Sequence, residues 1–136
     1  MSTLKAANLQ NTGSGAPTVK NSSGTEIGQL ALARCNFQGT GTSSIRDDFN
    51  VSSLTDNGTG DYTITWSNNF SNTNYTVVFG GYNTYVGDGS WNTICSRNSS
   101  NLWPTNVATS SIRITCFNSS GTAQDQNAVM LAAFGN

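Results

Sequence analysis

The clearest feature of this chain is a regular alternation of apolar and polar residues in three short segments. It occurs over Ala31–Gln38, Tyr62–Trp66 and Ile112–Cys116. A period of two residues places all apolar side chains on one side of an extended strand and all polar side chains on the other. Each of these segments is therefore predicted to be a half-buried β-strand.

The segment Ile45–Val51 is predicted to be another strand, with its odd-numbered residues on the buried side. Asp47 falls on that apolar side. A carboxylate there either ends the buried part of the strand or has a partner such as Arg46 or Arg34.

Three further segments are rich in apolar residues without strict alternation: Tyr75–Phe79, Trp91–Ser96 and Ala128–Phe134. The nearly continuous apolar run Tyr75–Phe79 is typical of a central strand that is buried on both sides. Ala128–Phe134 is too short for a stable helix and is predicted to be the last strand.

The segment Asn50–Trp66 predicts a β-hairpin. Its turn, Asp56–Gly60, reads DNGTG, and these residue types tolerate the positive φ angles that tight turns require. No segment shows sustained helical periodicity. About seven strands at this spacing predict an all-β fold, a small antiparallel β-sandwich over residues 31–136, with longer connections at 80–90 and 97–110.

Residues 1–30 form a different region, because they lack aromatic residues and contain few apolar ones. Such a segment cannot form a core alone. It is either a mobile tail or, as we favour, an extended N-terminal arm that gains order by packing on neighbouring chains or on a larger assembly.

Composition narrows the function classes. Ser, Thr, Asn and Gly make up half of the 136 residues, charged residues only 10%, and the net charge is −1. No basic patch predicts nucleic-acid binding, and no apolar run is long enough for membrane insertion. The N-terminus has no secretory signal pattern, so we expect synthesis in the cytoplasm. The aromatic residues support only a thin core, which predicts association of copies.

Candidate chemistry is sparse. The chain has no His, which excludes His-based catalytic triads and His metal sites. Cys35, Cys95 and Cys116 are predicted to be buried small hydrophobes, with one disulfide plus one thiol as the alternative. The carboxylates Asp56 and Asp61 flank a turn and are assigned structural roles there. We therefore expect no enzymatic activity, no cofactor and no metal.

One cluster of side chains has the composition of a binding site. The two longer connections bring aromatic rings together with amides, a carboxylate and a guanidinium. Aromatic faces stack on the apolar faces of sugar rings, and planar polar groups hydrogen-bond the surrounding hydroxyls. The candidate glycan contacts are Tyr82, Tyr85, Asp88, Trp91, Asn92, Arg97 and Trp103. The alternative is that these aromatic residues fill one end of the sandwich or an interface between subunits.

Several stretches resemble proteins of tailed bacteriophages. The segment FNVSSLTDNGTGDYTITW, from Phe49 to Trp66, is similar to a recurring segment of tail-fibre and tail-tip (receptor-binding) proteins. The preceding CNFQGTGTSSIRDDFN, the Asn74-Tyr75 and Val77-Val78 pairs, and the closing FNSSGTAQDQNAVMLAAFGN are similar to other parts of these proteins. The arm resembles the leaders of cyanobacterial-phage fibre proteins. The likeness is weakest over Thr84–Ser110.

The resemblance implies a virion protein, usually a homotrimer, with its C-terminal β domain displayed outward on the tail. Its expected partners are other copies of itself, other virion proteins through the arm, and a host-surface glycan. The motif marks a scaffold and transfers no binding residue. Two alternatives remain open. One is a virion protein without receptor binding, such as a capsid decoration or head-fibre protein. The other is a monomeric lectin-like module of cellular origin.

Overall fold

The computed structural model of the chain describes residues 18–83, 93–95, 107–118 and 120–135, which form ten β-strands and no helix. No helix in this part of the chain could therefore cross a membrane. The strands are β1 (Thr18–Lys20), β2 (Glu26–Gln29), β3 (Ala33–Gln38), β4 (Ser44–Phe49), β5 (Val51–Gly58), β6 (Asp61–Trp66), β7 (Thr76–Tyr82), β8 (Thr93–Cys95), β9 (Ser111–Phe117) and β10 (Ala128–Phe134).

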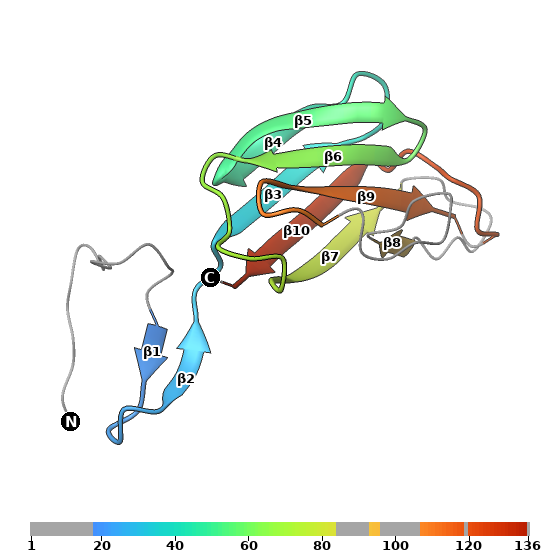
Figure 1. Cartoon of the computed structure of the whole chain (residues 1–136). Coiled ribbons are helices and arrows are strands. Elements are labelled where there is room, and N and C mark those ends of the chain that lie inside the picture. Colours follow the sequence, from blue (N-terminus) through green and yellow to red (C-terminus); the bar gives the residue numbers. More distant parts are fainter. Residues whose placement is uncertain (1–17, 84–92, 96–106, 119, 136) are drawn as a thin grey trace.

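Two four-stranded antiparallel sheets face each other and form a sandwich (Figure 1). The first sheet has the order β4-β3-β10-β7 and the second has the order β5-β6-β9-β8. Strands β1 and β2 form a separate two-stranded sheet. The predicted fold class, an all-β antiparallel sandwich, is confirmed.

The core lies between the two sheets and includes the apolar sets that the alternation predicted. Phe37, Tyr62 and Ile64 are fully buried, and the rings of Phe37 and Tyr62 meet edge to face at 5.0 Å. Burying a side chain of this size stabilises the fold by about 1.5–3 kcal/mol. The other buried apolar residues are Ala33, Cys35, Trp66, Phe70, Tyr75, Ile112, Ile114, Cys116, Ala128, Val129, Leu131 and Ala133.

Cys35 and Cys116 are buried among the apolar residues of the core, as predicted. Burial raises the pKa of Cys35 to about 12, with Asp48 and Asp47 adding to the effect. The thiol is therefore protonated and unreactive at neutral pH. Cys95 lies on β8.

The prediction of one strand over Ile45–Val51 is wrong, because the chain changes sheet inside this segment. Asn50 has a φ of 59°, which ends β4 in the first sheet and lets β5 begin in the second. The Asn50 side chain holds this crossing: its Oδ1 accepts a hydrogen bond from Asn68 N at 2.7 Å, and its Nδ2 donates to Asn68 O at 3.0 Å. Asn tolerates this left-handed conformation better than most residues.

Asp47 pairs with Arg34 on the neighbouring strand β3, which confirms one of the two interpretations of its position. The pairing between β3 and β4 shifts by one residue between Asn36 and Phe37. Ile45 therefore pairs with the buried Phe37, whereas Asp47 pairs with Asn36 and lies on the outer side of the sheet. The carboxylate therefore needs no place in the core.

Strand β7 lies at an edge of the first sheet, so the prediction of a central strand at Tyr75–Phe79 is wrong. Val77 and Phe79 pack against the core, but Val78 points outward and is 53% exposed. The apolar run is continuous because Val78 is an apolar residue on the outer side of the sheet. It does not mean that both sides of β7 are buried.

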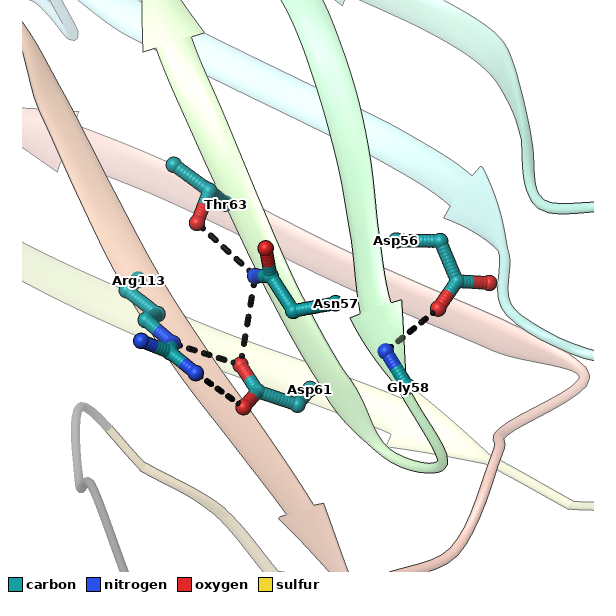
Figure 2. A network of polar contacts seen from close by, with 6 residues as sticks. All are labelled: Asp56, Asn57, Gly58, Asp61, Thr63 and Arg113. Carbon is teal, nitrogen blue, oxygen red and sulfur yellow. Dashed lines mark hydrogen bonds and ion pairs between the residues drawn. The ribbon is translucent and has the colours of Figure 1, made fainter.

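The predicted turn between β5 and β6 is confirmed. Gly58 and Gly60 have φ angles of 131° and 68°. A Cβ at Gly60 would lie 2.6 Å from the carbonyl oxygen of Cys116, so only glycine fits there. The Asp56 carboxylate accepts a hydrogen bond from Gly58 N at 2.9 Å (Figure 2).

Asp61, on the other side of this turn, also has a structural role. Its carboxylate accepts two hydrogen bonds from Arg113 of β9, from Nε at 2.8 Å and from Nη2 at 2.6 Å (Figure 2). Asn57 Nδ2 donates to Asp61 at 3.3 Å and to the Thr63 hydroxyl at 2.9 Å. The contacts between Asp61 and Arg113 join β6 to β9 across the outer side of the second sheet.

Within the predicted arm, β1 and β2 form a hairpin that the alternation did not reveal. The side-chain oxygen of Asn21 organises its turn by accepting hydrogen bonds from Ser23 N at 3.1 Å and Thr25 N at 2.9 Å. The hairpin projects beyond one end of the sandwich (Figure 1). Gln29 Nε2 ties its base to the carbonyl of Gly135 at 2.7 Å.

Candidate functional site

Of the predicted glycan contacts, the structure describes only Tyr82. This residue ends β7, pairs with Ala128 on β10 and is 51% exposed. The other six, Tyr85, Asp88, Trp91, Asn92, Arg97 and Trp103, lie outside the described residues. The structure therefore gives the anchor points of the candidate site and one of its side chains.

The described strands fix where the two longer connections attach. The first connection follows β7, which belongs to the first sheet, and precedes β8, which belongs to the second. Residues 96–106 run from the end of β8 to Val107, which forms a bridge with Ile112 of β9. Both connections therefore begin or end on the same small strand, β8.

A partly buried polar cluster lies at the end of the sandwich where Tyr82 is found. One carboxylate oxygen of Asp125 accepts hydrogen bonds from the Tyr62 hydroxyl at 2.6 Å and from Gly60 N at 2.7 Å. The Tyr62 hydroxyl also lies 3.2 Å from the carbonyl oxygen of Gly39. Next to Tyr82, Asn83 Nδ2 donates to the Asp125 carbonyl at 3.4 Å. The base of the candidate site is thus tied to the core of the fold.

The electrostatics of this cluster favour a fixed scaffold over acid–base chemistry. Burial raises the pKa of Tyr62, and its hydrogen bond to Asp125 raises the pKa further. The hydroxyl therefore stays protonated at all physiological pH values and acts as a hydrogen-bond donor. The described residues contain no group of three or more Cys, Asp or Glu side chains that could hold a metal ion.

Sequence reasoning missed Asp125 because nothing in its local pattern marks it. Its partner Tyr62 is 63 positions earlier in the chain. A single Asp in the polar stretch before the last strand is typical of an ordinary loop residue.

Surface grooves among the described residues include a small polar one of about 290 Å³ beside the hairpin, lined by Glu26, Gln29, Asn72, Asn74 and Gly135, and two larger ones. The first of the two larger grooves, of about 460 Å³, lies on the outer side of the first sheet and is lined mainly by Val78, Phe79, Met130, Leu131 and Ala132, with the Arg34–Asp47 pair beside them. The second, of about 850 Å³, lies at the crossing between the sheets.

The second groove is polar and has some of the chemistry that a sugar requires. It combines the half-exposed ring of Phe49 with the Asp48 carboxylate and the Asn69 amide. The Asn50 and Asn68 side chains in the same groove hydrogen-bond each other across the crossing. Because the Asn50 amide is already occupied by these contacts, the groove is a weaker candidate than the loop end of the sandwich.

Comparisons with known proteins yield a likeness of fold. No family model matches the chain, and no curated protein matches it. Among solved structures, the chain is similar to the phiAB6 tailspike in complex with three-repeated oligosaccharides of Acinetobacter baumannii surface polysaccharide. The TM-score is 0.51 and the identity 13%, over 98% of this chain and 30% of the tailspike chain.

At this identity, the likeness shows a shared fold, and this chain spans less than a third of the tailspike. The cyanobacterial-phage part of the resemblance has no support from the comparisons. What the described residues and the comparisons together establish is an all-β chain whose fold resembles part of a phage tailspike.

Proposed function

We propose that this chain is a bacteriophage virion protein, a tail-fibre or tail-tip protein that attaches to a host cell-surface glycan. The observation that carries the proposal is the likeness in fold, over 98% of the chain, to a tailspike in complex with oligosaccharides of a bacterial surface polysaccharide. The proposed location is the outer surface of the virion tail, after synthesis in the host cytoplasm.

The positions of the arm and of the candidate site support this proposal. The N-terminal hairpin is tied to Gly135, directly after the end of β10. Tyr82 pairs with Ala128, at the start of the same strand. A strand of seven residues spans about 20 Å, at roughly 3.3 Å per residue. The arm and Tyr82 thus lie at opposite ends of the sandwich, as a protein needs when it attaches to the tail at one end and meets the host at the other.

Glycan recognition would use the residues that the sequence singled out. Tyr82, Tyr85, Trp91 and Trp103 supply aromatic faces for sugar rings. Asp88, Asn92 and Arg97 supply hydrogen bonds to hydroxyl groups. The polar cluster at Tyr62 and Asp125 would hold the base of this site rigid, which lowers the entropy cost of binding.

We also propose that the protein binds without catalysing a reaction and without a cofactor. The polar groups of its described core favour this role. The Tyr62 hydroxyl and Asp125 satisfy each other, and Asp61 is held by Arg113. Carboxylates that hold the fold together are poorly placed to exchange protons with a substrate.

The proposal is tested by replacing Tyr85 and Trp91 together with Ala and measuring attachment of the purified protein to host cells. We expect attachment to be lost while the far-ultraviolet circular dichroism spectrum and the thermal midpoint stay unchanged. Ser53→Ala with Thr55→Ala, on the outer side of the second sheet, is the matched control and should attach normally. Undiminished attachment of the Tyr85/Trp91 variant would assign binding to another surface.

The alternative, a virion protein without receptor binding such as a capsid decoration or head-fibre protein, draws on a different observation. The hairpin exposes apolar side chains, as a docking segment would. A wild-type protein that enters virions but binds neither host cells nor their surface polysaccharide would favour this alternative. A protein lacking residues 1–29 that still enters virions would exclude docking through the arm under either proposal.

A further inference from the structure

The exposed large apolar side chains of the described residues fall into two groups at different places in the fold. Three belong to the arm: Val19 is 46% exposed, Ile27 64% and Leu30 47%. The other four lie on the outer side of the first sheet: Phe49, Val78, Tyr82 and Met130. In a chain whose other surfaces are rich in Ser, Thr and Asn, these two groups need an explanation.

We call Phe49, Val78 and Met130, with Ala132 between them, the outer patch. Strand pairing places Phe49, Ala132 and Val78 in one row across the sheet. Arg34 stands in this row between Phe49 and Ala132, and Ala132 pairs directly with Val78. In the next row, Met130 pairs with Gly80, which has no side chain to cover it. Val78, Met130 and Ala132 of this patch line the groove of about 460 Å³, whereas Phe49 lines the groove at the crossing.

We propose that the β1–β2 hairpin of one copy of this chain packs on the outer patch of a neighbouring copy. The inference goes beyond the proposed function and does not depend on glycan binding. One such contact would cover the exposed apolar side chains of the hairpin and those of the outer patch at the same time.

The direction of the hairpin favours a neighbouring copy over its own sheet. Gln29 is tied to Gly135, and Leu32 N donates to the carbonyl of Ala133 at 2.8 Å. These bonds hold the base of the hairpin at one end of the sandwich, and β1 and β2 extend beyond that end (Figure 1). Val19 and Ile27 are therefore available to another copy.

The side of the hairpin that carries Val19 is free of charge. Lys20 directly follows Val19 and pairs with Glu26 across the strands, whereas Val19 pairs with Gly28. Because successive residues of a strand point to opposite sides, the Lys20–Glu26 pair lies on the side opposite Val19. The side with Val19 therefore suits the apolar outer patch.

A contact between hairpin and sheet is heterologous, because it joins two different surfaces of the chain. Such contacts form a closed ring when the rotation that relates each copy to the next adds up to one full turn. Every copy then gives one hairpin and receives one. The predicted homotrimer is one such ring.

The first test is the native mass of the full-length chain by light scattering. We expect a multiple of the chain mass of 14.3 kDa for the wild type. The outer-patch variant Val78→Asp with Met130→Asp should have the mass of one chain, and so should the hairpin variant Val19→Asp with Ile27→Asp. The control Ser53→Asp with Thr55→Asp, on exposed positions of the other sheet, should keep the wild-type mass. A monomeric wild type, or an oligomer that survives either variant, would overturn the proposal.

A second test separates contact between hairpin and patch from contact between two patches. The outer-patch variant has an intact hairpin, and the hairpin variant has an intact patch. When the two are mixed at high concentration, one hairpin can occupy one patch, so a species of twice the chain mass should form. Failure to form it, with both variants folded by circular dichroism, would exclude the hairpin as the occupant. Host-cell attachment is measured separately, so failure here leaves the proposed function untouched.

Discussion

The outer sides of the two sheets differ sharply although both belong to one sandwich. On the second sheet the outward positions of β5, β6 and β9 are polar: Ser53, Thr55, Thr63, Thr65, Ser111 and Arg113. On the first sheet they include the apolar outer patch of Phe49, Val78, Met130 and Ala132. A sheet with one side in the core normally has polar residues on the other side, as the second sheet does. The first sheet departs from this rule, and the proposed contact with the hairpin of another copy would account for the difference.

The largest effects are expected in the core that the two sheets share. Ile64→Ala behind the polar side and Leu131→Ala behind the outer patch should each lower the free energy of unfolding by about 3 kcal/mol, because both side chains are buried. Urea denaturation measures both losses, in a Val78→Asp and Met130→Asp background that removes the proposed contact between copies. Thr55→Ala is the surface control. A much smaller loss for Leu131→Ala would mean that the difference between the sheets extends into the core.

A smaller effect is expected at Asn50, which joins the two sheets. Asn50→Ala should lower the free energy of unfolding by about 1–2 kcal/mol, because Ala at this positive φ is strained, and the bonds to Asn68 should add to the loss. Asn50→Gly accepts the φ and loses only the side-chain bonds, so it should cost less. Equal losses for Ala and Gly in urea denaturation would show that the side-chain bonds, and not the φ angle, matter at this crossing.

The smallest effects are expected at the two ion pairs, one on each outer side. The Asp61–Arg113 pair has two hydrogen bonds and a carboxylate that is only 25% exposed. Solvent screening limits such a pair, so Arg113→Met should cost about 0.2–1 kcal/mol at neutral pH. Arg34 and Asp47 are more exposed, and Arg34→Met should cost less than Arg113→Met.

The stabilisation by the Asp61–Arg113 pair should depend on pH. The hydrogen bonds from Arg113 hold the pKa of Asp61 below its ordinary value of 3.8 in the folded state. The stabilisation is therefore present above that pH and is lost as the pH falls through the lowered pKa. The difference in free energy of unfolding between wild type and Arg113→Met should stay constant near neutral pH and shrink below about pH 4. A difference that grows on acidification would contradict this account.

Much of the fold could be predicted from the sequence because the signals are local. The alternations at Ala31–Gln38, Tyr62–Trp66 and Ile112–Cys116 identified the buried side chains of β3, β6 and β9. The Asp56–Gly60 turn was also recognisable, since its glycines are needed at the positive φ angles found there.

The candidate site could be predicted only in part. Tyr82 is exposed, as a binding residue must be, whereas its six predicted companions lie outside the described residues and stay a prediction. The support beneath the site, Asp125 with Tyr62, was not predictable, because no local pattern connects residues that are 63 positions apart.

By itself, the sequence determined which side chains are apolar, which strands they make half-buried, and where the chain can turn. These properties depend on a few neighbouring residues and on the period of the strand. Only the tertiary structure decided that Asn50 carries the chain from one sheet to the other, that β7 is an edge strand, and that Val78 points away from the core. The physical reason is that pairing between distant strands fixes which side of each strand meets the core, and that pairing leaves no periodic trace in the sequence.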